Sequence, residues 1–186
     1  MAIESLQSIP LGTPAADFSL PDVVTGSVIS LSSLPSDRAL LIMFICRHCP
    51  YVVHVREEIL RIAHDYQHEG VTFVAICSND SAAYPDDAPH RLREMAVDHK
   101  FPFPLLHDES QDIAKVYGAQ CTPDFFLYDS NRRLIYHGRL DDSTPGNGIP
   151  VTGREMRRAL DSVLAGSAPP SAQKPSIGCS IKWKAP

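Results

Sequence analysis

The chain has 186 residues, of which 44% are hydrophobic and 21% are charged, and its formal net charge is -5. A chain of this length is most simply one domain with a single core. The negative charge argues against nucleic acid and anionic membranes as partners. No apolar run approaches the roughly 18 residues that a membrane span needs.

The N-terminus and the cysteine count bear on the cellular compartment. Residues 1–10 lack the basic and apolar segments of a signal peptide, so we expect a cytoplasmic protein. The five cysteines are an odd number. In a reducing compartment they favour catalytic or metal-binding use over a framework of structural disulfides.

The first half of the chain predicts a hairpin, a strand and a helix. Short apolar alternations at 18–22 and 28–31 flank a Thr-Gly-Ser turn and predict a small hairpin. The continuous apolar run from Ala39 to Ile45 predicts a buried central strand. From Val52 onward, apolar residues recur at steps of three and four, which is typical of one face of an α-helix.

The second half alternates strands and helices. Its predicted elements are a buried strand at 71–77, a loop at 78–90, a helix at 91–99, a short helix at 110–117, strands at 124–128 and 133–137, and a helix at 153–164. In the loop, Asp86 and Asp87 are expected to be solvated. This alternation predicts an α/β sandwich with a mixed central sheet flanked by helices.

Both ends of the chain are expected to be irregular. Residues 1–16 form a lead-in, and residues 167–186 hold four prolines and three lysines without an acidic residue. The sequence therefore predicts a domain at 1–166 and an irregular tail at 167–186 that carries Cys179. Apolar residues in the tail give it a means of docking onto that domain.

Two cysteines directly follow the predicted central strand. Cys46 and Cys49 lie at its junction with the helix, where backbone N–H groups and the helix dipole favour negative charge. Since the thiolate is the reactive form of cysteine, the pattern indicates thiol redox chemistry. Cys46 is expected to be the more acidic and to attack a substrate disulfide, and Cys49 to resolve the mixed disulfide. His48 is expected to stabilise the Cys46 thiolate.

The order of strand, C-x-x-C, helix and strand, with Thr122-Pro123 before a later hairpin, resembles the thioredoxin superfamily. The resemblance implies a thioredoxin-like three-layer sandwich. It also implies a cis bond at Pro123, whose loop lies against the dithiol and pairs with the substrate chain. Proline suits that position because it tolerates the cis form and lacks an N–H. Thr122 is expected to tune the same site.

Two stretches are similar to the redoxin (AhpC/TSA) branch of that superfamily. They are the opening from Pro14 to Leu20 and, more broadly, the span to about Leu164. The tail motif P-S-I-G-C-S-I-K-W-K at 175–184 resembles an uncharacterised redoxin subgroup that also carries C-x-H-C-P. Asp-Asp-Ser at 141–143 resembles the same subgroup and is expected either to border the substrate groove or to be a solvated turn.

The redoxin branch includes peroxiredoxins, which implies an alternative activity. In their T-x-x-C-P motif the cysteine before proline is peroxidatic, and Cys49-Pro50 occupies that place while Cys46 stands at the threonine. Cys49 would then attack a peroxide and form a sulfenic acid. The missing threonine, and the lack of an arginine at 120–123, favour thiol–disulfide exchange over this alternative.

The other three cysteines have different expected roles. Cys121 lies two residues before Pro123 and is either a third redox thiol or a semi-buried small residue. Cys179 is either a resolving thiol for the C-x-x-C pair or a docked tail residue. Cys77 ends an apolar strand and is expected to belong to the core.

A further alternative is a soft-metal carrier. Cys46, His48, Cys49 and Cys121 offer ligands for Cu(I) or Zn, but no second cysteine or histidine pair of the usual metal-site spacing follows, so we expect no metal site. The redox interpretation needs no cofactor. Its expected partners are protein or small-molecule disulfides, peroxides under the peroxidase alternative, and thioredoxin or glutathione as reductant.

Overall fold

The core of the molecule is a five-stranded mixed sheet. The computed structural model describes residues 2–6, 9–35 and 37–185. In spatial order the strands are β6 (Leu105–His107), β5 (Val71–Cys77), β4 (Ala39–Phe44), β8 (Asp124–Asp129) and β9 (Leu134–Gly138). The central strand β4 pairs in parallel with β5 and antiparallel with β8. All six residues of β4 are buried, which explains why its sequence is continuously apolar.

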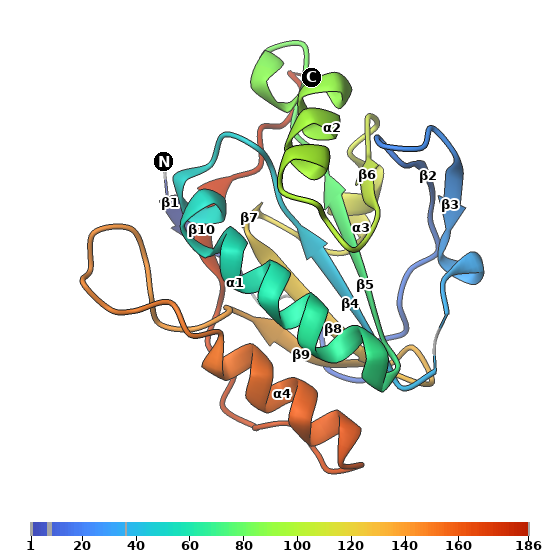
Figure 1. Cartoon of the computed structure of the whole chain (residues 1–186), viewed down its shortest axis with the longest axis vertical. Coiled ribbons are helices and arrows are strands. Elements are labelled where there is room, and N and C mark those ends of the chain that lie inside the picture. The colour runs from blue at the N-terminus through green and yellow to red at the C-terminus, as the bar shows by residue number, and fades with distance from the viewer. Residues whose placement is uncertain (1, 7–8, 36, 186) are drawn as a thin grey trace.

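Both faces of this sheet are covered, which gives three layers (Figure 1). One face presents Leu41 and Met43 to three helices, α1 (Pro50–Tyr66), α2 (Pro89–Asp98) and α4 (Arg154–Leu164). The opposite face presents Leu40 and Ile42 to the short helix α3 (Asp112–Val116) and to the hairpin of β2 (Ser19–Pro21) and β3 (Val28–Ser30). The predicted hairpin and the α/β sandwich with a mixed sheet are therefore confirmed.

A second, smaller sheet joins the two ends of the chain to its middle. β10 (Ile177–Ser180) lies between β1 (Ala2–Glu4) and β7 (Cys121–Thr122) and is antiparallel to both. The expectation that both chain ends are irregular is therefore wrong at residues 2–4 and 177–180, which form strands. The segment Ile-Gly-Cys-Ser has little intrinsic strand preference, and it becomes a strand because two partner strands supply its hydrogen bonds. The domain boundary at 166 stays a prediction.

The remaining elements are short. In the part of the chain that the structure describes, three single-turn 3-10 helices, η1 (Leu31–Ser33), η2 (Gln67–Glu69) and η3 (Pro85–Asp87), connect larger elements. Among the described residues, no helix combines the length and the apolar character needed to cross a membrane.

Candidate active site

Helix α1 begins after the second cysteine of the C-x-x-C motif. Its first residue is Pro50, and Cys49 is the N-cap, with φ -70° and ψ 122°. Proline favours the first helical position because its missing N–H has no intrahelical acceptor there. Cys46 therefore lies outside the helix. Cys49 alone occupies the helix N-terminus, where backbone N–H groups and the dipole favour negative charge.

The loop around Pro123 lies directly against both sulfurs. The Thr122-Pro123 peptide bond is cis. The Sγ atom of Cys46 is 3.2 Å from the Thr122 hydroxyl oxygen, and the Sγ atom of Cys49 is 3.1 Å from the Thr122 carbonyl oxygen. Cys46 and Cys49 are only 1% and 0% exposed. The fold thus brings a strand end, a helix start and a distant loop to one buried point.

The acidities of the two thiols are the reverse of the sequence expectation. The pKa of Cys49 is lowered to about 4, chiefly because the Cys46 thiol donates a hydrogen bond to it. Burial opposes this effect, whereas the Cys179 thiol and the backbone N–H groups of Val52 and Cys179 reinforce it. The same cysteine–cysteine hydrogen bond raises the pKa of Cys46 well above its usual value, and burial and the charge of Asp87 raise it further. Cys49, and not Cys46, is the more acidic thiol.

One contact works against the thiolate. The Thr122 carbonyl accepts the Cys49 proton whenever that thiol is protonated. Against this single acceptor stand two thiol donors and two backbone N–H donors, and the N-terminus of α1 adds to them. The balance favours a negative Cys49 sulfur.

A buried carboxylate lies behind Cys46, where the sequence predicts a solvated one. Asp87 is 0% exposed. It accepts hydrogen bonds from the Arg47 backbone N–H at 2.8 Å and the Asn79 side-chain amide at 2.7 Å, and it lies 2.6 Å from Nδ1 of His48. These partners replace water and make burial of the carboxylate tolerable. No local pattern in the Asp- and Pro-rich loop indicates this role.

The same residues form a candidate metal group, although not the expected one. Cys46, His48 and Asp87 each offer a ligand atom, and these atoms lie within 4.8 Å of one another. Within the described residues, Cys49 and Cys121 do not belong to this group. The donor types suit zinc. A metal would have to compete with the hydrogen bonds that the Asp87 carboxylate already accepts.

The C-terminal strand β10 lies across the cis-proline loop. Cys179 stands opposite Thr122 in the pairing of β10 with β7. The Thr122 carbonyl oxygen lies 3.1 Å from the Cys49 sulfur, and hydrogen bonding by Cys179 contributes to the lowered pKa of Cys49. A Cβ atom at Gly178 would lie 2.0 Å from the Thr122 carbonyl oxygen, so this close approach requires glycine. The structure therefore places a third sulfur beside the C-x-x-C pair.

The remaining two cysteines are fully buried. Burial and the charge of Asp124 raise the pKa of Cys121, whose sulfur lies 3.6 Å from the Pro123 carbonyl oxygen. Burial also raises the pKa of Cys77, which is 0% exposed as the core assignment predicts. Thiols with raised pKa values are poor nucleophiles at neutral pH.

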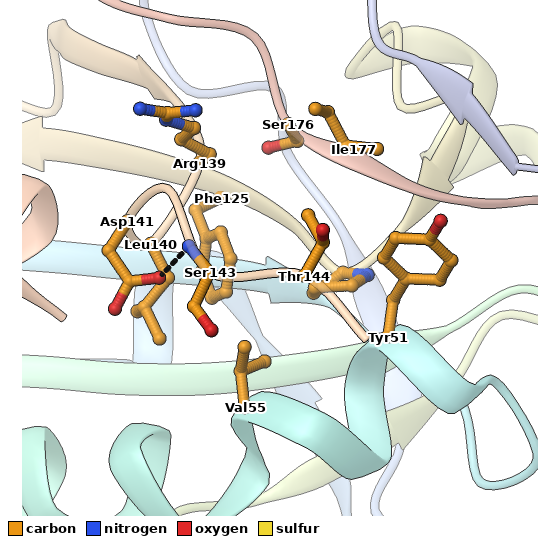
Figure 2. Close-up of a pocket in the computed structure, with 11 residues that line it drawn as sticks. Tyr51, Val55, Phe125, Arg139, Leu140, Asp141, Ser143, Thr144, Ser176 and Ile177 are labelled. Carbon is orange, nitrogen blue, oxygen red and sulfur yellow. Dashed lines mark hydrogen bonds between the residues drawn. The ribbon is translucent and has the colours of Figure 1, made fainter. Parts of the chain in front are cut away.

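A shallow hollow opens beside the cis-proline, with Tyr51, Val55 and Pro123 among its lining residues. Figure 2 shows its walls, which come from the first turns of α1 with Tyr51 and Val55, from the loop after β9, and from Ser176 and Ile177 at the start of β10. The hollow shares the cis-proline Pro123 with the loop that meets the sulfurs, but no cysteine is among its lining residues.

The Asp-Asp-Ser segment borders this pocket, which is one of its two expected roles. Asp141 is 4% exposed and accepts hydrogen bonds from the backbone N–H groups of Ser143, Thr152 and Gly153. Figure 2 draws the first of these bonds. The buried carboxylate holds the loop that forms one wall of the pocket.

Comparison with known proteins agrees with this geometry. Residues 11–137 match the family model of the AhpC/TSA family. The chain belongs to the AhpC/TSA family. This redoxin also resembles an uncharacterised conserved protein from Geobacillus kaustophilus at 52% identity and a TM-score of 0.97, covering 100% of this chain and 98% of that one. A hypothetical protein from Sinorhizobium meliloti is 49% identical, with a TM-score of 0.95 and coverages of 98% and 99%.

A more distant match identifies the fold. A putative thioredoxin from Neisseria meningitidis is 22% identical with a TM-score of 0.62, and the alignment covers 82% of the redoxin and 91% of that chain. The redoxin therefore has the thioredoxin-like fold that its motifs indicate. No curated protein matches this chain.

Proposed function

We propose that this redoxin is a thiol–disulfide oxidoreductase in which Cys46 and Cys49 cycle between two thiols and one disulfide. The observation that carries the proposal is that both sulfurs lie against Thr122, Cys46 Sγ 3.2 Å from its hydroxyl oxygen and Cys49 Sγ 3.1 Å from its carbonyl oxygen, at the start of α1. There Cys46 donates to Cys49, whose pKa is about 4. A low-pKa thiolate with a second thiol in contact is the arrangement that disulfide exchange requires.

The proposed reaction assigns attack to Cys49, which reverses the roles expected from the sequence. The Cys49 thiolate attacks one sulfur of a substrate disulfide, and the other substrate sulfur leaves as a thiolate and takes up a proton. Cys46 then loses its proton and attacks the Cys49 sulfur of the mixed disulfide. A Cys46–Cys49 bond forms, the second substrate thiol leaves, and the substrate has gained two electrons.

The substrates that fit this chemistry are disulfides of small molecules or of protein side chains, which would approach over the cis-proline loop that contacts both sulfurs. A partner thiol, from thioredoxin or glutathione, would return the pair to the reduced form. We assign the reaction to the cytosol, because reducing conditions there keep such cysteines as thiols.

A second candidate is thiol peroxidase activity, and the low pKa of Cys49 favours it. The more acidic cysteine is the one that precedes Pro50, which is the peroxidatic position implied by the family resemblance. Its thiolate would attack a peroxide to give a sulfenic acid and water or an alcohol, and Cys46 would resolve the sulfenic acid to a disulfide with release of water. The absence of threonine at 46 and of arginine at 120–123 makes this the weaker candidate.

Single-turnover kinetics separate the two candidates. The reduced protein is mixed with glutathione disulfide or with hydrogen peroxide, and the loss of free thiols is followed with time. We expect faster loss with the disulfide, accumulation in Cys46→Ser of a Cys49–glutathione adduct or of the Cys49–Cys179 disulfide that replaces it, and no fast reaction in Cys49→Ser. Cys77→Ala, which removes a core sulfur, is the matched control. A faster reaction with peroxide, leaving a sulfenic acid on Cys49 in Cys46→Ser, would instead support the peroxidase.

A further inference from the structure

The sulfurs of the proposed pair have almost no exposed surface at which a reducing partner could attack. Cys46 and Cys49 are 1% and 0% exposed, and β10 covers the adjoining Thr122. A thiol can reduce a disulfide only if it reaches one of the two sulfurs. Among the five cysteines, all of which the structure describes, Cys179 alone is not fully buried.

Cys179 holds a fixed place beside Cys49. It pairs with Thr122 in the β10–β7 register, and the Thr122 carbonyl oxygen lies 3.1 Å from the Cys49 sulfur. The lowered pKa of Cys49, to which hydrogen bonding by Cys179 contributes, agrees with this proximity. The surrounding tail is held by backbone hydrogen bonds over its whole docked length. They join Ser5 N–H to Ser176 O, Ile181 N–H to Gln120 O, Lys182 N–H to the Asn79 side chain, and Lys184 N–H to the Gln111 side chain. Cys179 therefore belongs to a docked strand and not to a swinging arm.

We propose that Cys179 is a third redox thiol of this site and that it carries the disulfide from the buried pair to the surface. The inference rests on the proposed function, because it needs a Cys46–Cys49 disulfide as its starting point. It names the route by which the reductant reaches that disulfide.

The relay consists of thiol–disulfide exchanges. The Cys179 thiolate attacks the Cys49 sulfur of the Cys46–Cys49 disulfide. A Cys49–Cys179 bond forms, and Cys46 leaves as a thiolate that takes up the proton lost by Cys179. A partner thiolate then attacks Cys179 and releases Cys49 as a thiolate. A second partner thiol displaces Cys179 from the mixed disulfide, so two partner thiols are oxidised to one disulfide and three protein thiols are restored.

The charges at the site change in the direction that the relay needs. In the reduced protein, burial and the neighbouring Cys49 thiolate raise the pKa of Cys179 to about 11, while Lys182 lowers it. When Cys49 is in a disulfide with Cys46 it carries no charge, so Cys179 ionises more readily. When the reductant attacks Cys179, the group that leaves is the low-pKa sulfur of Cys49, and such sulfurs leave fastest.

A peptide map can detect the relay bond directly. Trypsin places every cysteine on its own peptide, because Arg47 lies between Cys46 and Cys49 and Lys182 follows Cys179. The reduced protein is treated with one equivalent of glutathione disulfide, free thiols are blocked in acid, and linked peptides are identified by mass spectrometry. We expect peptide 48–56 linked to 39–47 in one fraction and to 159–182 in another.

Reduction kinetics test whether the bond lies on the route of electrons. Oxidised Cys179→Ser should keep the Cys46–Cys49 disulfide but be reduced by glutathione at least about tenfold more slowly, since the accessible sulfur is gone. Ser180→Ala, on the opposite face of the same strand, is the matched control and should match the wild-type rate. Fluorescence of Trp183, the chain's single tryptophan, checks that the tail stays docked.

The outcomes separate the relay from the function on which it rests. Wild-type reduction of Cys179→Ser, without any Cys49–Cys179 bond in the native chain, refutes the relay and leaves the proposed dithiol chemistry intact. Failure of the wild-type protein to consume the disulfide or to form a Cys46–Cys49 bond refutes both.

Discussion

The hydrogen bond between Cys46 and Cys49 sets the acidity of the site, and replacing one atom tests it. Cys46→Ala removes the donor, whereas Cys46→Ser keeps a donor of similar size. The Cys46 thiol is the largest of the causes that lower the pKa of Cys49 to about 4. A hydrogen bond to a charged group contributes about 1.5–3 kcal/mol, and about 1.36 kcal/mol corresponds to one pH unit. Alanine should therefore move the midpoint of thiolate formation up by about one to two pH units, and serine should leave it near the wild-type value.

The ultraviolet absorbance of the thiolate measures this midpoint without requiring access to the buried sulfur. Between about pH 3 and pH 8 only Cys49 should ionise, because the pKa values of the other four thiols lie above their ordinary values. An alanine variant with the wild-type midpoint would show that the Cys46 thiol does not stabilise the thiolate. A wild-type protein whose first thiolate forms only near the ordinary cysteine pKa would refute the reversed assignment of the pair.

Three other substitutions test neighbouring features. Asp87→Asn removes the charge that raises the pKa of Cys46, so Cys46 should resolve a mixed disulfide faster in stopped-flow kinetics; slower resolution would show instead that the carboxylate accepts the Cys46 proton. Thr122→Val removes a hydroxyl that lowers the same pKa, so resolution should be slower than in the wild type, and an unchanged rate contradicts this. Gly178→Ala places a Cβ atom 2.0 Å from the Thr122 carbonyl oxygen. Such overpacking costs about 1–3 kcal/mol, which corresponds to a Tm lower by about 2–12 °C for a chain of this size. Calorimetry checks the Tm, and alkylation should reveal an unmasked Cys49; an unchanged Tm with Cys49 still protected would contradict this account of the tail.

Local patterns were sufficient for the elements that position the site. The continuous apolar run of β4 and the three- and four-residue spacing in α1 each report burial of a strand or of one helix face, and the neighbouring backbone sets that burial. The Thr122-Pro123 pair before β8 located the loop that meets the sulfurs. The start of α1 could also be predicted from the sequence, since proline favours the first helical position and Pro50 follows Cys49. This start places Cys49 at the helix N-terminus, where a thiol has a lower pKa.

Features that depend on distant partners could not be predicted in this way. An aspartate in an Asp- and Pro-rich loop has the same local pattern whether it is solvated or, like Asp87, buried against partners from two other segments, Arg47–His48 and Asn79. β10 is a strand because β1 and β7 lie on either side of it. Its four residues show no sequence pattern that predicts either pairing. Tertiary context decided both cases.

The small sheet β1–β10–β7 makes the reactivity of a central cysteine depend on the integrity of both chain termini. β1 pairs with β10 along three residues, from Ala2 to Glu4, and β10 in turn rests on the loop against Cys49. Loss of residues 2–4 to a protease would remove one of the two strands that flank β10 and leave it as an edge strand paired with β7. Loss of β1 would therefore weaken the attachment of β10 to the cis-proline loop and expose the Cys49 thiolate. Residues 2–4 are far from α1 in the sequence. A tag fused next to β1 or β10 would therefore change the surroundings of Cys49.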